Sequence, residues 1–108
     1  MGVSIDQFNA LEIKIGTVEH VERVPDSDKL LRLQVNVGEG SLRQILSGIA
    51  AFVNPEDIVG RQFPFITNLE PRVIRGLVSN GMLLAIGDDE GFALMSPTRQ
   101  VLPGARVR

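Results

Sequence analysis

The 108-residue chain contains no cysteine, tryptophan or tyrosine and only one histidine. The lack of cysteine excludes disulfides, thiolate metal ligands and cysteine nucleophiles, and it is typical of a reducing compartment. Because five phenylalanines are the only aromatic residues, a surface of many stacked bases is not expected, which argues against a general single-strand binder. No apolar run approaches the ~18 residues of a membrane span and no export signal is visible, so the expected location is the cytoplasm.

The charge balance limits the kinds of partner that the chain can bind. Its formal net charge is −2, whereas proteins that coat nucleic acid indiscriminately carry a large positive excess. Any RNA binding must therefore come from a local basic patch. His20 is the single histidine, and Asp26 and Asp28 lie in a turn-forming segment without a base or nucleophile motif beside them. No metal, cofactor or enzymatic activity is therefore predicted.

Apolar and polar residues alternate along several segments, as they do in half-buried strands. The alternation at 11–15 predicts a long first strand that is bent at Gly16, where the pattern changes phase, and that ends near Val24. Pro25, Asp26 and Ser27 follow as typical turn residues. The clearest alternation, at 31–37, ends at the Gly-rich residues 38–41, which predicts a hairpin into 42–47.

The second half is expected to contain one short helix and further strands. At 54–60, an N-cap type Asn54 precedes Pro55 and two acidic residues, and Gly60 follows, which predicts the helix. Strands are predicted at 63–65 and 82–86, an irregular loop at 68–81, and a turn at 88–91 into 92–95 before an extended tail. This order of elements predicts a single domain over residues 1–108, an all-β OB-fold five-stranded barrel with one short helix and a C-terminal extension.

Several motifs of the chain also resemble those of a known family. They are Leu11–Gly16, Pro25–Leu30, Arg43–Ile49, Asn68–Pro71 and Arg75–Leu84. In order and spacing they resemble the tRNA-binding domain family, which includes the C-terminal domain and free beta subunit of methionyl-tRNA synthetases and stand-alone bacterial tRNA-binding proteins. The resemblance extends from about Phe8 to Val107. It implies an OB-fold, recognition of tRNA by shape, and a homodimer in the bacterial members.

The resemblance also implies which residues face RNA. Carried over position by position, these are Lys14, Lys29, Arg75, Ser79 and Met82, with Arg72 and Asn80 in the same loop. Lys and Arg pair with phosphates, Ser and Asn bond to sugars or base edges, and an exposed Met packs against a base. A plainer interpretation stands beside each role: the charged residues are also what a solvated surface carries, and Met82, which begins an apolar run, also suits the core.

Three functions are compatible with the sequence. The first is a non-catalytic tRNA-binding module that raises tRNA affinity, either as a free homodimer or as part of methionyl-tRNA synthetase. The second is a polypeptide-binding module, because one branch of the family resembles a secretion-related chaperone, although Ser79–Met82 resembles the RNA-binding branch more closely. The third is a pure dimerisation domain of a synthetase. The expected partners are tRNA, a second copy joined through Val3–Leu11 and Val101–Val107, and the catalytic subunit of methionyl-tRNA synthetase.

Overall fold

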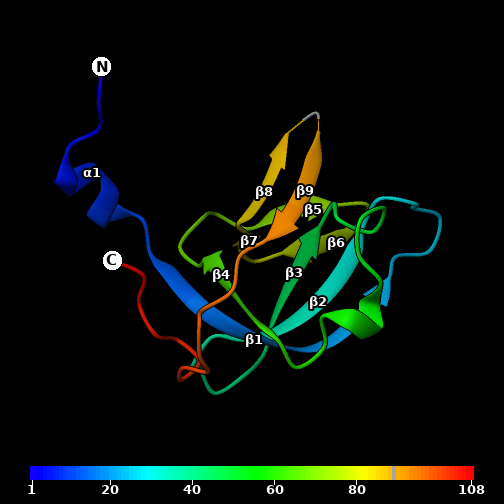
Figure 1. Cartoon of the computed structure of the whole chain (residues 1–108). Helices are drawn as coiled ribbons and strands as arrows, with labels where there is room; N and C mark the ends of the chain where they lie inside the picture. The colour runs from blue at the N-terminus through cyan, green and yellow to red at the C-terminus, as the bar shows by residue number, and fades with distance from the viewer. Residues whose placement is uncertain (89) are drawn as a thin grey trace.

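The computed structural model describes residues 1–88 and 90–108, and a five-stranded antiparallel sheet forms its centre (Figure 1). The strand order is β3-β2-β1-β4-β7. The strands are β1 (Ile13–Arg23), β2 (Leu31–Asn36), β3 (Arg43–Ser47), β4 (Gln62–Ile66) and β7 (Met82–Leu83). The segments predicted as strands near 11–24 and 31–37 are therefore strands, and the antiparallel pairing of β2 with β3 confirms the predicted hairpin into 42–47.

The two edges of the sheet approach each other and nearly close it into a barrel. The backbone N–H of Asn80 donates to the carbonyl of Gln44 on β3 (2.8 Å), and the Leu46 N–H donates to the Ser79 Oγ (3.0 Å). These bonds join β3 to the segment that leads into β7. The five-stranded barrel predicted from the sequence is confirmed, and its topology is that of the OB-fold.

The barrel encloses an apolar core that follows the period of the strands. On β2, Leu31, Leu33 and Val35 are fully buried, while the residues between them are half-buried. On β4 every residue is buried, with Phe63 and Phe65 at the centre of the core. Burying two phenyl side chains contributes roughly 2–3 kcal/mol each, so the core that positions the surface loops is anchored mainly by β2 and β4.

The inward face of the first strand changes phase at Gly16, as the sequence predicts, because Ile13 is buried, Ile15 is half-buried, and Gly16 and Val18 are buried. A register shift against β2 lies further along, between Val18 and His20. A Cβ atom at Gly16 would lie 2.6 Å from Val35 Cγ1 and 2.9 Å from a ring carbon of Phe65. The phase change in the sequence therefore marks close packing of the backbone against the core.

The prediction of an irregular loop at 68–81 is wrong. Strands β5 (Arg72–Ile74) and β6 (Leu77–Ser79) form a hairpin there. Both residues of its turn, Arg75 and Gly76, have positive φ angles of 51° and 78°. Two-residue hairpin turns of this kind favour Asn or Asp before Gly. Because Arg75 stands at that position, the sequence lacks the usual pattern from which this turn could be predicted. A second hairpin joins β8 (Ala85–Asp88) to β9 (Gly91–Leu94), and the predicted turn at 88–91 includes Asp89, which lies outside the described residues.

The α-helix lies elsewhere than predicted. Residues 54–60 contain only one 3-10 turn, η1 (Pro55–Asp57), and Asn54 makes no side-chain cap bond there. The helix is α1 (Ile5–Ala10), whose Ser4 hydroxyl accepts from the Gln7 N–H while the Gln7 side chain accepts from the Ser4 N–H. This capping box was readable as Ser4 followed by Gln three residues later.

The C-terminal extension is held against β1. The Ile15 N–H donates to the Ala105 carbonyl (2.8 Å), and the Val107 N–H donates to the Ile13 carbonyl (2.8 Å). Further along the tail, the Gln62 side chain exchanges two hydrogen bonds with the backbone of Val101. In the part of the chain that the structure describes, no helix is long and apolar enough to cross a membrane.

Candidate nucleic-acid interface

The loop between β1 and β2, residues 24–30, forms one side of the candidate interface. Its turn is built as the sequence predicts, since the Ser27 Oγ accepts from the backbone N–H groups of Lys29 (3.3 Å) and Leu30 (3.2 Å). Asp26 takes a positive φ of 64°, a conformation that Asp tolerates better than most residues. The Lys29 side chain is exposed. The loop therefore holds a cation at the surface on a backbone fixed by Ser27.

The β5–β6 hairpin forms the other side. Arg72 and Arg75 are both exposed, and Arg75 occupies the turn. The Arg75 Nη1 atom donates to the carbonyl oxygen of Asp26 at 3.2 Å, which joins the hairpin to the 24–30 loop. Among the described residues, no carboxylate lies within 4.0 Å of Lys29, Arg72 or Arg75. Their charges are therefore available to a phosphate.

A polar network runs across the outer face of the sheet between these two loops. The Arg32 guanidinium pairs with Glu22 (3.0 Å) and donates through Nε to the Gln44 side chain (2.7 Å). The Gln44 amide then donates to the Val78 carbonyl (2.8 Å), at the end of the hairpin. Sequence reasoning missed Arg32 and Gln44. They occupy the outward positions of paired strands β2 and β3, and this alternation was the signal that could have found them.

The segment from Ser79 to Met82 has a largely structural placement. Ser79 is 1% exposed, and its hydroxyl accepts from the Leu46 N–H and donates to the Gly81 carbonyl. Gly81 has a φ of 143°, and a Cβ there would lie 2.8 Å from Ile45 Cδ1. Asn80 and Met82 are half-buried. Ser79 is thus placed to shape the hairpin base, and the expected direct contact of its hydroxyl with RNA is at odds with its burial.

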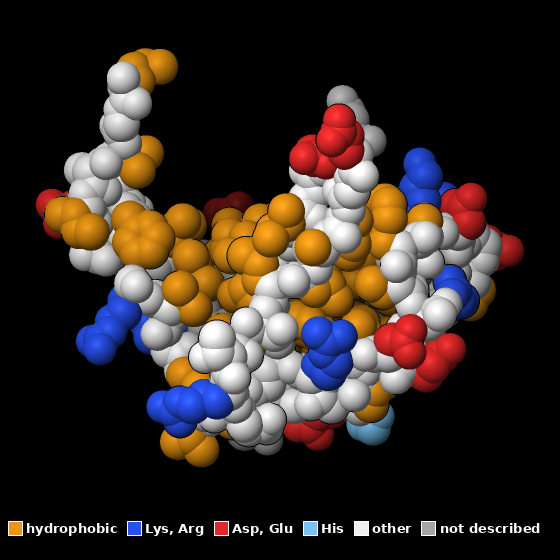
Figure 2. All heavy atoms as spheres, viewed as in Figure 1, with side chains coloured by type: hydrophobic (Ala, Val, Ile, Leu, Met, Phe, Trp, Pro, Cys, Tyr) orange, Lys and Arg blue, Asp and Glu red, His pale blue; other side chains and the backbone are white. Residues whose placement is uncertain are grey.

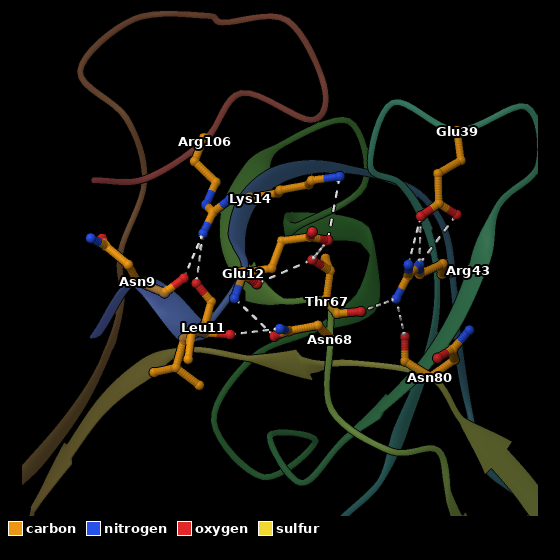
Figure 3. A network of polar contacts seen from close by, with 11 residues as sticks. Asn9, Leu11, Glu12, Lys14, Glu39, Arg43, Thr67, Asn68, Asn80 and Arg106 are labelled. Carbon is orange, nitrogen blue, oxygen red and sulfur yellow. Dashed lines mark hydrogen bonds and ion pairs between the residues drawn. The ribbon is translucent and has the colours of Figure 1, made fainter. Parts of the chain in front are cut away.

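Lys14 lies in a second polar network beside the C-terminal tail (Figure 3). Its Nζ atom pairs with the Glu12 carboxylate at 3.4 Å, and that carboxylate also accepts from the Thr67 hydroxyl (2.6 Å). The Thr67 hydrogen bond, together with the Lys14 charge, holds the pKa of Glu12 below its ordinary range. Because Lys14 is matched by an acid and is half-buried, it is less available to a phosphate than Lys29 is.

Arg43 extends the same network to the hairpin base. Its guanidinium pairs with Glu39 (2.6 Å) and donates to the backbone carbonyls of Thr67 and Asn80 (Figure 3). The hydrogen bond from Arg43 lowers the pKa of the Glu39 carboxyl. Arg43 therefore fixes the position of Asn80 relative to β4, and it is a positioning residue that sequence reasoning missed.

The structure thus divides the residues predicted to face RNA. Lys29, Arg72 and Arg75 are exposed on the two joined loops, Asn80 and Met82 are half-buried at the hairpin base, Ser79 is buried, and Lys14 lies in the second network. We define the RNA-side surface as residues 24–30, the β5–β6 hairpin and the outer face that carries Arg32 and Gln44.

An OB-fold barrel with basic side chains on the loop after β1 and on the hairpin between the last two barrel strands has the layout of a nucleic-acid-binding domain. Residues 13–106 match the family described as "Putative tRNA binding domain". The chain belongs to this tRNA-binding domain family, as the sequence motifs indicated.

Relatives at the sequence level are methionyl-tRNA synthetases. The chain is 44% identical over 105 residues to the methionine–tRNA ligase of Helicobacter pylori strain 26695, and 48% identical over 106 residues to that of Methanoregula boonei. These alignments cover 97% and 98% of the chain. The chain spans only 16% of the length of either relative.

Solved structures share the fold over the full chain. The methionyl-tRNA synthetase related protein of Pyrococcus horikoshii aligns with a TM-score of 0.93 at 33% identity, covering 100% of this chain and 99% of that one. The chaperone CsaA of Bacillus anthracis strain Ames aligns with a TM-score of 0.88 at 27% identity, covering 100% of both chains. The fold is therefore shared by relatives with two different names.

Proposed function

We propose that this chain is a non-catalytic module that binds folded tRNA through the RNA-side surface. The observation that carries the proposal is the hydrogen bond from Arg75 to the Asp26 carbonyl, since it joins two surface loops that each carry an exposed cation, Lys29 and Arg75. Cations on two fixed loops pair with phosphates whose spacing depends on RNA shape. The family match supports tRNA as the RNA.

We propose that the biological role of the chain is to raise the affinity of methionyl-tRNA synthetase for tRNA. The relatives named as methionine–tRNA ligases carry a matching segment, which supports this choice of enzyme. A module with few phosphate contacts binds weakly alone, but it raises the effective concentration of tRNA at a catalytic subunit to which it is attached or docked. Action in the cytoplasm, where translation takes place, follows from the same role.

We also propose that the chain forms a homodimer through its N- and C-terminal segments. Ile5 and Leu11 on and after α1 are exposed, and a mainly apolar groove of about 260 Å³ lies next to the tail. Figure 2 shows hydrophobic side chains gathered between α1 and the β8–β9 hairpin. The groove is lined by Ile13, Ile15, Pro64, Leu84, Met95, Ser96, Pro97 and Val107. A two-fold dimer would cover this surface and present two RNA-side surfaces to one tRNA.

A titration with tRNA tests the proposal. At low salt, tRNA should bind saturably, and added salt should weaken binding with the slope of a few phosphate contacts. An unstructured RNA and a plain RNA duplex should compete poorly. Lack of tRNA binding at low salt would reject the proposal.

Lys29→Ala supplies the site-specific test. It should weaken binding and reduce the salt slope by about 0.7–0.9, the value for one lost phosphate contact. Arg99→Ala is the matched control, because Arg99 is an exposed cation on the C-terminal tail, outside the RNA-side surface. Equal losses in both variants would indicate that net charge, rather than the RNA-side surface, governs binding.

A polypeptide-binding role is the second candidate, and the groove favours it. The aligned CsaA structure is named as a chaperone, and an apolar groove suits an extended apolar segment of an unfolded chain. This role predicts that an unfolded polypeptide binds in the groove and aggregates less when this chain is present. Lys29→Ala should leave such binding unchanged. Binding of an unfolded polypeptide, combined with no binding of tRNA in the titration, would favour this role.

A further inference from the structure

Phe52 is an unusually exposed aromatic residue for this chain. Its side chain is 62% exposed, whereas Phe63 and Phe65 are fully buried. Its ring stacks on that of Phe92, with 4.6 Å between the ring centroids and 11° between the ring planes. Phe92 is half-buried on β9 and packs against the core. One ring is therefore anchored, and it supports the other at the surface.

The backbone that carries Phe52 is fixed as well. The N–H groups of Phe52 and Val53 both donate to the Ile49 carbonyl, at 2.9 Å and 3.2 Å. The Ala50 N–H donates to the Lys29 carbonyl at 3.0 Å, which attaches this segment to the 24–30 loop. The exposed ring is thus held in one place relative to the RNA-side surface, so binding to it costs little ordering entropy.

Two cationic residues are bonded to the segment that carries Phe52. The Arg23 guanidinium donates to the Ala50 carbonyl at 3.4 Å, and Lys29 is the residue bonded to Ala50 from the other loop. The β8–β9 hairpin, whose β9 strand carries Phe92, has Asp88 and Glu90 at its tip, where Figure 2 shows acidic side chains. Arg23 and Lys29 therefore supply positive charge next to the segment that carries Phe52, whereas the hairpin tip is acidic.

We propose that the Phe52–Phe92 stack is a platform on which one unpaired nucleobase of the bound RNA stacks. The inference rests on the proposed tRNA-binding function and adds the part of the RNA that is recognised beyond its phosphates. An aromatic face accepts any base, because every base has a π-face. The phosphates next to that base would lie at Arg23 and Lys29, so the platform and the cations bind one continuous strand.

A plainer role for Phe52 is to cover the ring of Phe92 from water, and a leucine would fulfil that role equally. Phe52→Leu keeps an apolar cover and removes the aromatic face. It should weaken binding of a tRNA transcript about tenfold without changing the salt slope. Val59→Ala, at an exposed apolar position beyond η1, is the matched control and should bind as the unaltered chain does.

Phe52→Trp gives a direct optical readout, because the chain contains no other tryptophan. Its fluorescence should be quenched on saturation with tRNA, and a blunt RNA duplex without unpaired bases should not quench it. This variant keeps the test valid even if Phe52→Leu does not fold.

The outcomes separate this inference from the proposed function. If the unaltered chain does not bind tRNA, both fail. If the chain binds tRNA but Phe52→Leu binds equally well and the Phe52→Trp fluorescence does not change, the platform is refuted while tRNA binding stands. Quenching by an unfolded polypeptide, but not by tRNA, would also refute it, since the occupant would then be protein.

Discussion

Arg75 and Asp26 are joined by a hydrogen bond of 3.2 Å, and they are the two non-glycine residues with positive φ among those that the structure describes. Left-handed backbone costs a non-glycine residue about 1–2 kcal/mol. Two residues that carry this cost therefore meet where the 24–30 loop touches the β5–β6 hairpin. Such strain is commonly found at functional sites, in agreement with the proposed RNA-side surface.

Two replacements of Arg75 distinguish the effect of its backbone conformation on stability from the effect of its charge on tRNA binding. Arg75→Gly should be about 1 kcal/mol more stable than Arg75→Ala, because glycine adopts positive φ without a steric penalty. Both variants should lose tRNA affinity, since both remove the guanidinium. Urea unfolding and tRNA titration of the two variants check this. If Arg75→Gly bound tRNA as the unaltered chain does, the Arg75 charge would have no part in binding.

Ser79 should matter for folding more than for direct contact with RNA. Ser79→Ala leaves the buried Leu46 N–H without its acceptor, which should lower the free energy of unfolding by about 1–3 kcal/mol. Denaturant unfolding measures this loss, and Ser41→Ala, at an exposed position, is the control. A fully stable Ser79→Ala variant that no longer binds tRNA would instead restore the direct contact implied by the family resemblance.

The lowered pKa of Glu12 predicts how the stability of the fold depends on pH. Its folded-state pKa is lowered by the hydrogen bond from Thr67 and then by the Lys14 charge. A lowered pKa means that the ionised form stabilises the fold, and that this contribution is present above the ordinary value near 4.3 and is lost as pH falls through the lowered value. The stability advantage over Glu12→Gln should therefore shrink below about pH 4. Thermal unfolding across this range measures it.

Thr67→Val tests the cause of that shift. Without the Thr67 hydroxyl, the pKa of Glu12 should rise toward its ordinary value, because the hydrogen bond from Thr67 is the largest influence that lowers it. The acid-induced loss of stability assigned to Glu12 should then be smaller. A loss as steep as in the unaltered chain would show that other carboxylates, such as Glu39 with its lowered pKa, dominate acid unfolding.

The apolar groove also provides a test of the proposed homodimer. Val107 lines the groove, and Val107→Asp would place a charge against apolar side chains, which is costly when it is buried. Light scattering should report a monomer for this variant and a dimer for the unaltered chain. Val59→Asp should remain dimeric, because Val59 lies outside the groove. A monomeric unaltered chain would remove the basis of the dimer proposal.

Strand β2 could be predicted from residue alternation, because burial on one face imposes a period of two on it, and the Gly-rich residues 38–41 then predicted β3 as its hairpin partner. The β5–β6 hairpin could not, since its turn places Arg75 where Asn or Asp is usual. The signal for α1 was present in Ser4 and Gln7, but a six-residue helix without buried residues has no apolar periodicity to support it.

The candidate site was predictable only in part. The cations Lys29, Arg72 and Arg75 were named from the family resemblance, and the structure places all three at the surface. The burial of Ser79 and the pairing of Lys14 with Glu12 depend on segments far apart along the chain, and no local pattern encodes such contacts. The strand pattern places Arg32 on the outward face of β2, but its hydrogen bond to Gln44 exists only once β2 and β3 pair.

The bonds from residues 104–107 to the beginning of β1 also cover a strand edge of the barrel. Strand β2 pairs with β1 only from Thr17 onward, so the stretch at Ile13 and Ile15 has the tail as its neighbour on that side. An uncovered, apolar strand edge recruits strands from other molecules and seeds aggregation. Proteolytic loss of the tail after Pro103 would therefore uncover the edge of β1, where strands of other molecules could pair. A chain without its tail should for this reason aggregate at lower concentration than the intact chain.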